Sequence, residues 1–265
     1  MKVLKVPFSK GGMSTPSGCE LAPDVIIEKS KELFLNEFGY RTEFDVSEVE
    51  VDQGNIEVTQ KNVYDAVKKI AEDVISPRAC VLGGDHSVTY GAFKGFVAKH
   101  NGAGLVVLDA HPDCETGVVS ATHEDYLRGL VKDGVVDRNR IVVFGIRNWS
   151  GNEKEFLETN RIKHYNMKHI MLNGLSEMVD TVTEMVKEWG PTYLSVDIDV
   201  CDPAFAPGTG YCEPGGFTSR ELIYVVQRLK LLKNIKMIDI VEVNPKKDRD
   251  GMTSKLAAKL LVEMS

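Results

Sequence analysis

The chain of 265 residues is 43% hydrophobic and 27% charged, and its formal net charge is −7. These proportions are typical of an ordered globular protein and argue against intrinsic disorder. The negative charge argues against a general binder of phosphate backbones, so we expect no nucleic-acid partner. No apolar run approaches the ~20 residues that span a bilayer, and Pro7 interrupts the first apolar stretch before a signal-peptide core could form. We therefore expect no membrane association.

Five cysteines are scattered along the chain, and no C-x-x-C pair occurs. An odd number of separated cysteines is typical of reduced, mostly structural thiols rather than of a disulfide framework or a zinc knuckle. This pattern and the absence of a signal-peptide core predict a cytoplasmic location.

Short apolar, β-branched runs alternate with longer amphipathic segments along the whole chain. We predict strands over residues 2–6, 41–46, 79–82, 104–108, 140–145, 161–165, 192–196 and 236–241. We predict helices over residues 24–38, 56–75, 87–99, 122–131, 175–189, 219–232 and 253–264. Several strands are continuously apolar, as strands buried on both faces of a parallel sheet are. The alternation predicts a three-layer α/β/α fold, and since no Pro-, Gly- or Ser-rich linker divides it, a single domain over residues 1–265.

Polar clusters follow four of the predicted strands, at the edge where open parallel sheets bind their ligands. They read GGDHS at 83–87, DAHPD at 109–113, DIDVCDP at 197–203 and EVNP at 242–245. In extended backbone, alternate side chains point to the same side, so the alternating acidic residues would face one point. Carboxylates packed so closely repel each other, and burying them without compensation is costly. A multivalent cation would resolve this conflict, and we infer a metal site.

The candidate ligands are two imidazoles and four carboxylates: His86, Asp109, His111, Asp113, Asp197 and Asp199. Six ligands are too many for one tetrahedral zinc ion, but they fit two ions that share bridging carboxylates. Oxygen-rich ligation with some imidazole favours manganese, with magnesium, iron or zinc as alternatives. Two such ions ~3.5–4 Å apart generate a hydroxide nucleophile at neutral pH.

Four motifs, taken in their order along the chain, resemble those of the ureohydrolases, the family of arginase and agmatinase. They are GGDHS, DAHPD, SVDIDVCDPAFAPGTG and DIVEVNP. The resemblance runs from about residue 3 to the C-terminus. It implies one α/β domain with an eight-stranded parallel sheet, two Mn²⁺ ions per chain held by the six candidate ligands, and hydrolysis of a guanidino group to urea and an amine. It also implies a homo-oligomer, either a trimer or a hexamer.

The resemblance assigns roles to further residues. Glu242 matches the glutamate that holds the substrate's guanidinium, and His123 matches the histidine that shuttles protons. The leaving amine needs a proton, which Asp113 or His123 could supply. The family usually has glycine after this histidine, whereas this chain has Glu124, and the loop before it is short.

Two features favour agmatine as the substrate. The PGTG run at 207–210 and the LAAKLL run at 256–261 resemble agmatinase more than arginase. Glu115 lies where arginases carry a polar residue that helps to hold the substrate's α-carboxylate. A carboxylate at this position would repel that group and attract a second cation, so we expect Glu115 and Glu242 to bind substrate. The expected products of agmatine are urea and putrescine, which would place the enzyme in polyamine metabolism.

Several alternatives remain open. The same metal site could hydrolyse arginine or formiminoglutamate, and the anionic formiminoglutamate would need a nearby arginine, for which Arg147 is the candidate. A deacetylase-like enzyme with one zinc ion shares the fold, but His86 and the second D-x-D motif supply a second metal position. A ureohydrolase-like regulatory protein would typically lack metal ligands, whereas this chain retains all six.

Overall fold

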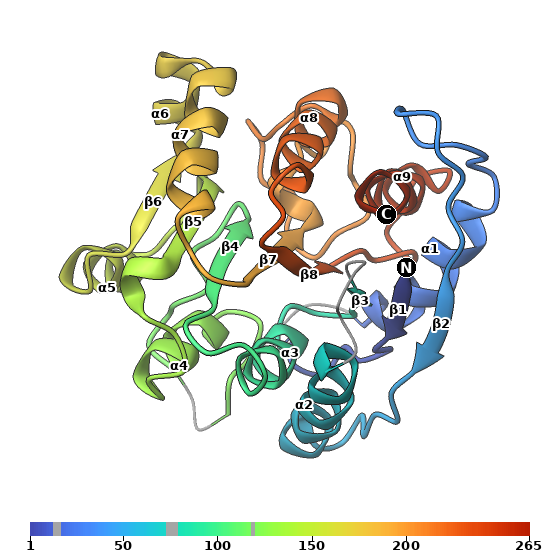
Figure 1. The fold of residues 1–265 in the computed structure, drawn as a ribbon, viewed down its shortest axis with the longest axis horizontal. Coiled ribbons are helices and arrows are strands. Elements are labelled where there is room, and N and C mark those ends of the chain that lie inside the picture. The colour runs from blue at the N-terminus through green and yellow to red at the C-terminus, as the bar shows by residue number, and fades with distance from the viewer. Residues whose placement is uncertain (13–16, 73–78, 118–119) are drawn as a thin grey trace.

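The computed structural model describes residues 1–12, 17–72, 79–117 and 120–265. In this described part of the chain, one sheet of eight strands has the order β2-β1-β3-β8-β7-β4-β5-β6 (Figure 1). All neighbouring strands are parallel, which confirms the predicted fold class. The strands are β1 (Lys2–Lys5), β2 (Asp45–Glu48), β3 (Ala79–Leu82), β4 (Gly104–Leu108), β5 (Ile141–Ile146), β6 (Lys163–Asn166), β7 (Thr192–Asp197) and β8 (Ile235–Val241).

Helices cover both faces of this sheet. Helices α1 (Ala22–Ser30), α6 (Met167–Asn173), α7 (Leu175–Lys187), α8 (Ser219–Lys230) and α9 (Met252–Met264) pack on one face. Helices α2 (Ile56–Glu72), α3 (Val88–Val97), α4 (Tyr126–Lys132) and α5 (Gly151–Thr159) pack on the other. Figure 1 shows the two layers above and below the central strands. Among the described residues, no helix combines the length and the apolar character needed to cross a membrane.

The apolar strands owe their composition to burial on both faces. In β4, Val106 and Leu108 belong to the core beneath one helical layer, whereas Leu105 and Val107 belong to the core beneath the other. Successive side chains of a strand point to opposite faces, so a strand covered on both sides must be apolar at every position.

Several element boundaries differ from the predictions. Helix α1 ends at Ser30 rather than at residue 38, because Phe34 and Phe38 continue the apolar spacing but are exposed and have no core to pack on. The second strand lies at Asp45–Glu48 rather than at 41–46, at the sheet edge, where all four residues are exposed and leave no burial pattern. Helix α4 begins at Tyr126 rather than at residue 122. The last residues of the predicted helix 56–75 lie outside the described residues.

Candidate active site

The four polar clusters begin at the same level of the sheet. The sheet register aligns Leu82 of β3, Ile240 of β8, Val196 of β7 and Leu108 of β4 in one row. These four strands are adjacent in the sheet order, although they lie far apart in sequence. The polar residues that follow each strand therefore meet at the middle of the carboxyl edge, where open α/β sheets bind ligands.

A glycine allows the loop after β3 to reach this edge. A Cβ atom at Gly84 would lie 1.5 Å from the carbonyl oxygen of Phe8, so no other residue fits there. The next residue, Asp85, accepts a hydrogen bond from the backbone amide of Gly11 at 2.8 Å, which fixes the N-terminal segment against the loop. This packing fully buries His86.

Two side chains at the site extend from left-handed backbone. Asp113 has a φ of 49° and Glu242 a φ of 62°, a region that residues with a Cβ atom rarely adopt. Such a conformation persists only where surrounding contacts impose it. For Glu242, the amide donates to the carbonyl of Gly84 at 2.8 Å, and its carboxylate Oε1 accepts from the amide of His86 at 2.8 Å.

The six predicted ligands form two groups with one member in common. The first group contains His86, Asp109, Asp113 and Asp197, and the second contains Asp109, His111 and Asp199. The ligand atoms of each group lie within 4.8 Å of one another. Asp109 belongs to both groups, so it would contribute to holding both ions if two are bound. One premise of the two-ion hypothesis was wrong, because Asp199 lies in a 3₁₀ turn (Ile198–Val200) and not in extended backbone.

Two buried atoms in the first group lack hydrogen bonds. Neither Nδ1 of His86 nor Oδ2 of Asp109 has a hydrogen-bond partner among the described residues, and the two atoms lie 3.2 Å apart. Oδ2 of Asp113 is 2.8 Å and Oδ2 of Asp197 is 3.2 Å from the same Nδ1 atom. Converging, unsatisfied donor atoms of this kind fit a hard divalent cation.

The ring of His86 is fixed from behind by a buried hydroxyl and carboxylate. The hydroxyl of Ser195 donates to Oδ1 of Asp239 at 2.6 Å, and its oxygen lies 2.8 Å from Nε2 of His86. Since the single hydroxyl proton goes to Asp239, Nε2 must donate to Ser195. The unshared electron pair of the neutral ring then lies on Nδ1 and faces the carboxylates, which is the tautomer a metal ligand needs.

Two of the clustered carboxyl groups, Asp113 and Asp197, are harder to ionise than usual. Burial and the charge of Asp109 raise the pKa of Asp113 to about 8. Burial and the charge of Asp199 raise the pKa of Asp197 well above its usual range. Bound divalent ions reverse this effect by favouring the ionised carboxylates. The donor set, its burial and its pKa values therefore all fit a binuclear metal centre.

Glu242 and His123 lie side by side next to the ligand groups, and both are almost fully buried. Nδ1 of His123 is 3.2 Å from Oε1 of Glu242. Burial disfavours the charged imidazole, but the hydrogen bond to Glu242 and its charge outweigh this effect and raise the pKa of His123 to about 9. Nε2 of His123 has no hydrogen-bond partner among the described residues.

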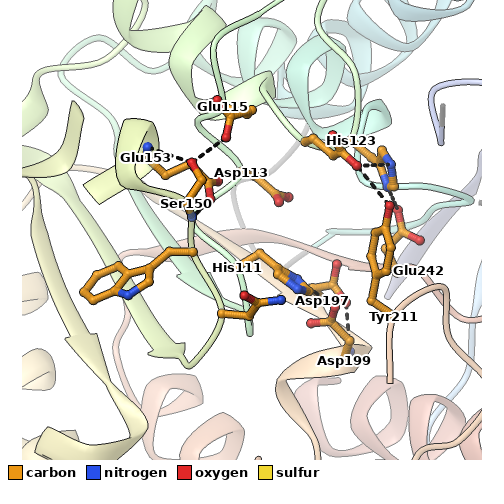
Figure 2. A pocket seen from close by; sticks show the side chains of 13 residues that line it. His111, Asp113, Glu115, His123, Ser150, Glu153, Asp197, Asp199, Tyr211 and Glu242 are labelled. Atoms are coloured by element: carbon orange, nitrogen blue, oxygen red, sulfur yellow. Dashed lines mark hydrogen bonds and ion pairs between the residues drawn. The ribbon is translucent and has the colours of Figure 1, made fainter. Parts of the chain in front are cut away.

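A solvent-open cavity of about 300 Å³ lies over this site. In Figure 2, Tyr211, His123 and Glu242 form one side of it and Glu115, Ser150 and Glu153 the other. Within the described residues no lysine or arginine side chain lines the cavity, whereas its acidic lining residues are Asp113, Glu115, Glu124, Glu153, Asp197, Asp199 and Glu242. The cavity is therefore suited to a cation.

Glu115, the other residue predicted to bind substrate, lines this cavity, but its carboxylate already accepts hydrogen bonds from neighbouring residues of the chain. The hydroxyl of Ser150 donates to Oε2 at 2.5 Å, and Asn152 donates to Oε1 at 3.0 Å. The amide of Thr116 donates to Oε1 at 2.7 Å. Hydrogen bonds from Ser150 and Thr116 lower the pKa of Glu115 to about 2, so this carboxylate is ionised.

Arg147 does not line the cavity. Its guanidinium donates to backbone carbonyls of four residues, Asp199, Val200, Cys201 and Glu213. This side chain ties the loop after β7 to the segment at 213 and is not placed to receive a substrate carboxylate.

Several cavity residues were not predicted from the sequence. Helix α5 brings Glu153 to the cavity, and the S-x-x-E spacing of Ser150 and Glu153 was a visible signal, since both halves of a capping box are present. Asp239, a charged residue within an apolar strand, was a second signal of a buried polar network. No local signal marks Tyr211 or Trp149, which reach the cavity from irregular segments.

The sequence profile of the arginase family matches residues 1–265. The chain is 32% identical over 271 residues to mitochondrial agmatinase of Gallus gallus, covering 98% of this chain and 78% of that protein. It is 30% identical over 275 residues to formimidoylglutamase of Halalkalibacterium halodurans, covering 98% of this chain and 84% of that protein. The solved structure of formimidoylglutamase from Bacillus subtilis superposes with a TM-score of 0.94 at 25% identity, over 99% of this chain and 85% of that one.

These similarities extend over the whole sheet and include the segments that carry the six candidate ligands. Enzymes of this family depend on a binuclear metal centre, and the convergence of His86, Asp109 and the other four ligands provides a site for one. The chain belongs to the arginase family, whose members are hydrolases that act on C–N bonds in linear amidines.

Proposed function

We propose that this protein hydrolyses agmatine to urea and putrescine with two Mn²⁺ ions per chain. The observation that carries the proposal is the cavity, which carboxylates and imidazoles line without any lysine or arginine among the described residues. Agmatine has a guanidinium at one end, an ammonium at the other and no carboxylate. An acidic cavity without a cationic side chain stabilises such a dication and repels a carboxylate.

The alternative substrates fit this cavity less well. Arginine carries an α-carboxylate, which would face Glu115 and Glu124 at the cavity wall. Formiminoglutamate carries two carboxylates, and Arg147, the candidate to bind one of them, is already bonded to backbone carbonyls. Relatives named agmatinase and formimidoylglutamase match at similar identity, so the preference for agmatine rests on the cavity and not on the comparisons.

The six predicted ligands would hold the metal ions, with Asp109 common to both groups. Divalent ions at such a site supply a hydroxide nucleophile at neutral pH. Manganese is preferred because four carboxylates and two imidazoles form an oxygen-rich donor set without thiolates.

The chain's own residues would orient the substrate and handle the proton. The amide of His86 and the ring of His123 fix Oε1 of Glu242, so this carboxylate is held ready to accept paired hydrogen bonds from a guanidinium. Hydrolysis breaks the bond between the guanidinium carbon and the alkyl-bearing nitrogen, and the departing amine must gain a proton. His123 lines the cavity, and its unpartnered Nε2 would deliver this proton, with Asp113 as the second candidate donor.

We further propose, from the family resemblance, that residues 1–265 form one domain and that the chain assembles into a trimer or hexamer in the cytoplasm. Light scattering of the purified protein tests the assembly, and a monomer at micromolar concentration would contradict it.

A urea-release screen of manganese-loaded protein tests the substrate. It compares agmatine, arginine, 4-guanidinobutyrate and formiminoglutamate, with release of formamide or ammonia measured for the last. An oppositely signed interaction at a partly exposed site is worth ~1 kcal/mol in each direction, so kcat/KM for agmatine should exceed that for arginine at least roughly tenfold. Faster turnover of arginine would contradict the proposal.

A further inference from the structure

Glu124 lies across the imidazole of His123 from Glu242. Nδ1 of His123 is 3.2 Å from Oε1 of Glu242, and Nε2 is 3.7 Å from Oε1 of Glu124. The side chain of Glu242 is 6% exposed and that of Glu124 is 40% exposed. The path from Glu242 past His123 to Glu124 therefore runs from the buried end of the cavity to its open end.

Tyr211 holds Glu124 in this position. Its hydroxyl donates to Oε1 of Glu124 at 2.9 Å, and its ring stacks on the ring of His123 with centroids 5.9 Å apart and planes inclined by 18°. Figure 2 shows Tyr211 beside His123, with its hydroxyl end directed toward that residue's side of the cavity. Tyr211 thus supplies an aromatic wall along which an alkyl chain can pass.

A backbone hydrogen bond joins Glu115 and Glu124, but their carboxylates accept different numbers of hydrogen bonds. The amide of Glu115 donates to the carbonyl of Glu124 at 3.0 Å. Four donor groups satisfy the carboxylate of Glu115, namely the hydroxyls of Ser150 and Thr116, the amide of Thr116 and the side chain of Asn152. A carboxylate has about four acceptor sites, so this one has little left for a ligand. Within the described residues, Tyr211 is the one hydrogen-bond donor to the carboxylate of Glu124.

An unpartnered polar atom lies next to Glu124. Nε2 of His123 has no hydrogen-bond partner among the described residues, although the side chain is 5% exposed and lines the cavity. A buried ring nitrogen without a partner points to a polar group of a ligand between it and the cavity. Glu124 is the next acidic group along the path toward solvent.

We infer that Glu124 is the specificity-determining residue of the cavity and binds the distal ammonium group of a dicationic guanidino substrate. The inference rests on the proposed function, which places the guanidinium at Glu242. It assigns the distal cation to a residue that replaces the glycine usual after this histidine, and not to Glu115. Glu124 binds the end of the substrate that does not react, so it acts on affinity rather than on the chemical step.

The test compares agmatine with n-butylguanidine, which has the same alkyl chain without the ammonium group. Glu124→Gln should raise KM for agmatine about fivefold, the upper range for an exposed ion pair, and leave KM for n-butylguanidine and both kcat values within about twofold. Tyr211→Phe, which keeps the ring and removes the hydroxyl, should raise KM for agmatine by a smaller factor. Glu188→Gln, an exposed carboxylate that does not line the cavity, is the control.

Three results would overturn the inference. The first is an equal rise of KM for both substrates in Glu124→Gln. The second is a fall of kcat for both substrates with a shifted pH profile, which would make Glu124 a positioning residue for His123. The third is a larger agmatine-specific rise of KM in Glu115→Gln than in Glu124→Gln.

Failure of the proposed function gives a different result, in which the manganese-loaded wild type releases urea from no guanidine. Calorimetric binding of agmatine then replaces KM as the readout. Weaker binding of agmatine, but not of n-butylguanidine, to Glu124→Gln supports the inference, and equal affinity of the variant and the wild type overturns it. Thermal unfolding of each variant verifies that it is folded.

Discussion

At the scale of single residues, the most informative feature is a pair of buried atoms without hydrogen bonds. Leaving a buried donor or acceptor unsatisfied costs ~1–3 kcal/mol, so native proteins rarely do so. Nδ1 of His86 and Oδ2 of Asp109 are two such atoms, 3.2 Å apart, next to carboxylates whose pKa values burial has raised. A cation between them would offset this cost, while Ser195 and Asp239 hold the ring of His86 on the opposite side.

Removing one ligand from each group should remove a different ion. Manganese-loaded wild type should contain two ions per chain, and Asp113→Ala and Asp199→Ala should each lose at least one, because the two residues belong to different groups. Elemental analysis after gel filtration measures this. Asp202→Asn, in the same segment as Asp199 but outside both groups, should keep both ions. A wild type that saturates at one ion would disprove the binuclear centre.

His123 should assist the reaction without holding metal. Its Nδ1 atom contacts Glu242 and not a ligand group, so His123→Asn should lower kcat by about a hundredfold, a common size for the loss of a proton-transfer group, and keep both ions. Steady-state kinetics and metal analysis on the same sample provide the two readouts. Loss of both ions in this variant would show that His123 is structural.

Activity should increase between pH 7 and pH 9. Divalent ions at the site would supply more hydroxide as the pH rises, whereas the hydrogen bond and charge of Glu242 outweigh the effect of burial and raise the pKa of His123 to about 9, so this proton donor stays largely protonated up to that pH. A profile of kcat/KM against pH measures the increase. A maximum near pH 5 would be incompatible with a hydroxide nucleophile supplied by divalent ions.

At the scale of elements, helix α5 links the sheet to the cavity wall. The hydroxyl oxygen of its N-cap residue, Ser150, accepts a hydrogen bond from the amide of Glu153, and the carboxylate of Glu153 accepts one from the amide of Ser150. The hydroxyl of Ser150 also donates to Glu115, so one residue both begins the helix and shapes the cavity. The alternation of strands and helices was predictable because it follows from local hydrophobic periodicity, but this short helix has a weak apolar pattern and was missed.

Ser150→Ala should therefore have two effects. Loss of an N-cap costs ~1 kcal/mol, so the free energy of unfolding should fall by about that amount in urea denaturation. Asn166→Ala, which removes the N-cap of α6 away from the cavity, should cause a similar loss of stability. Only Ser150→Ala should also change KM for the substrate, because only Ser150 lines the cavity. Identical kinetics of the two variants would contradict a role of α5 in the site.

At the scale of the whole molecule, the site makes stability depend on pH when metal is absent. Burial and the charge of Asp109 raise the pKa of Asp113 to about 8, and burial and the charge of Glu242 raise the pKa of Asp85 to about 6. A raised carboxyl pKa means that the folded state binds the proton more tightly than the unfolded state. The resulting stability is complete below about pH 4, the usual pKa of an unfolded aspartate, and is lost as the pH rises through the folded-state values.

The metal-free protein should consequently unfold at lower temperature at pH 8 than at pH 5. Each proton held in the folded state alone contributes a slope of about 1.4 kcal/mol per pH unit. With Mn²⁺ bound the carboxylates are ionised at both pH values, so the stabilisation by Mn²⁺ should grow with pH. Scanning calorimetry with chelator and with excess Mn²⁺ measures both curves. A metal-free melting temperature that rises from pH 5 to pH 8 would refute this explanation.

The sequence by itself determined the parallel α/β fold and the identity of the candidate ligands. Buried strands need apolar residues at every position, and polar residues directly after four of them are visible without knowledge of the fold. Only the tertiary structure decided the order β3-β8-β7-β4 that brings these clusters together, because pairing between strands distant in sequence leaves no local periodicity. It also decided which carboxylate remains available for a ligand. Glu115 and Glu124 look alike in the sequence, but Ser150 donates a hydrogen bond to Glu115 and Tyr211 donates one to Glu124, and these donors are 35 and 87 residues away.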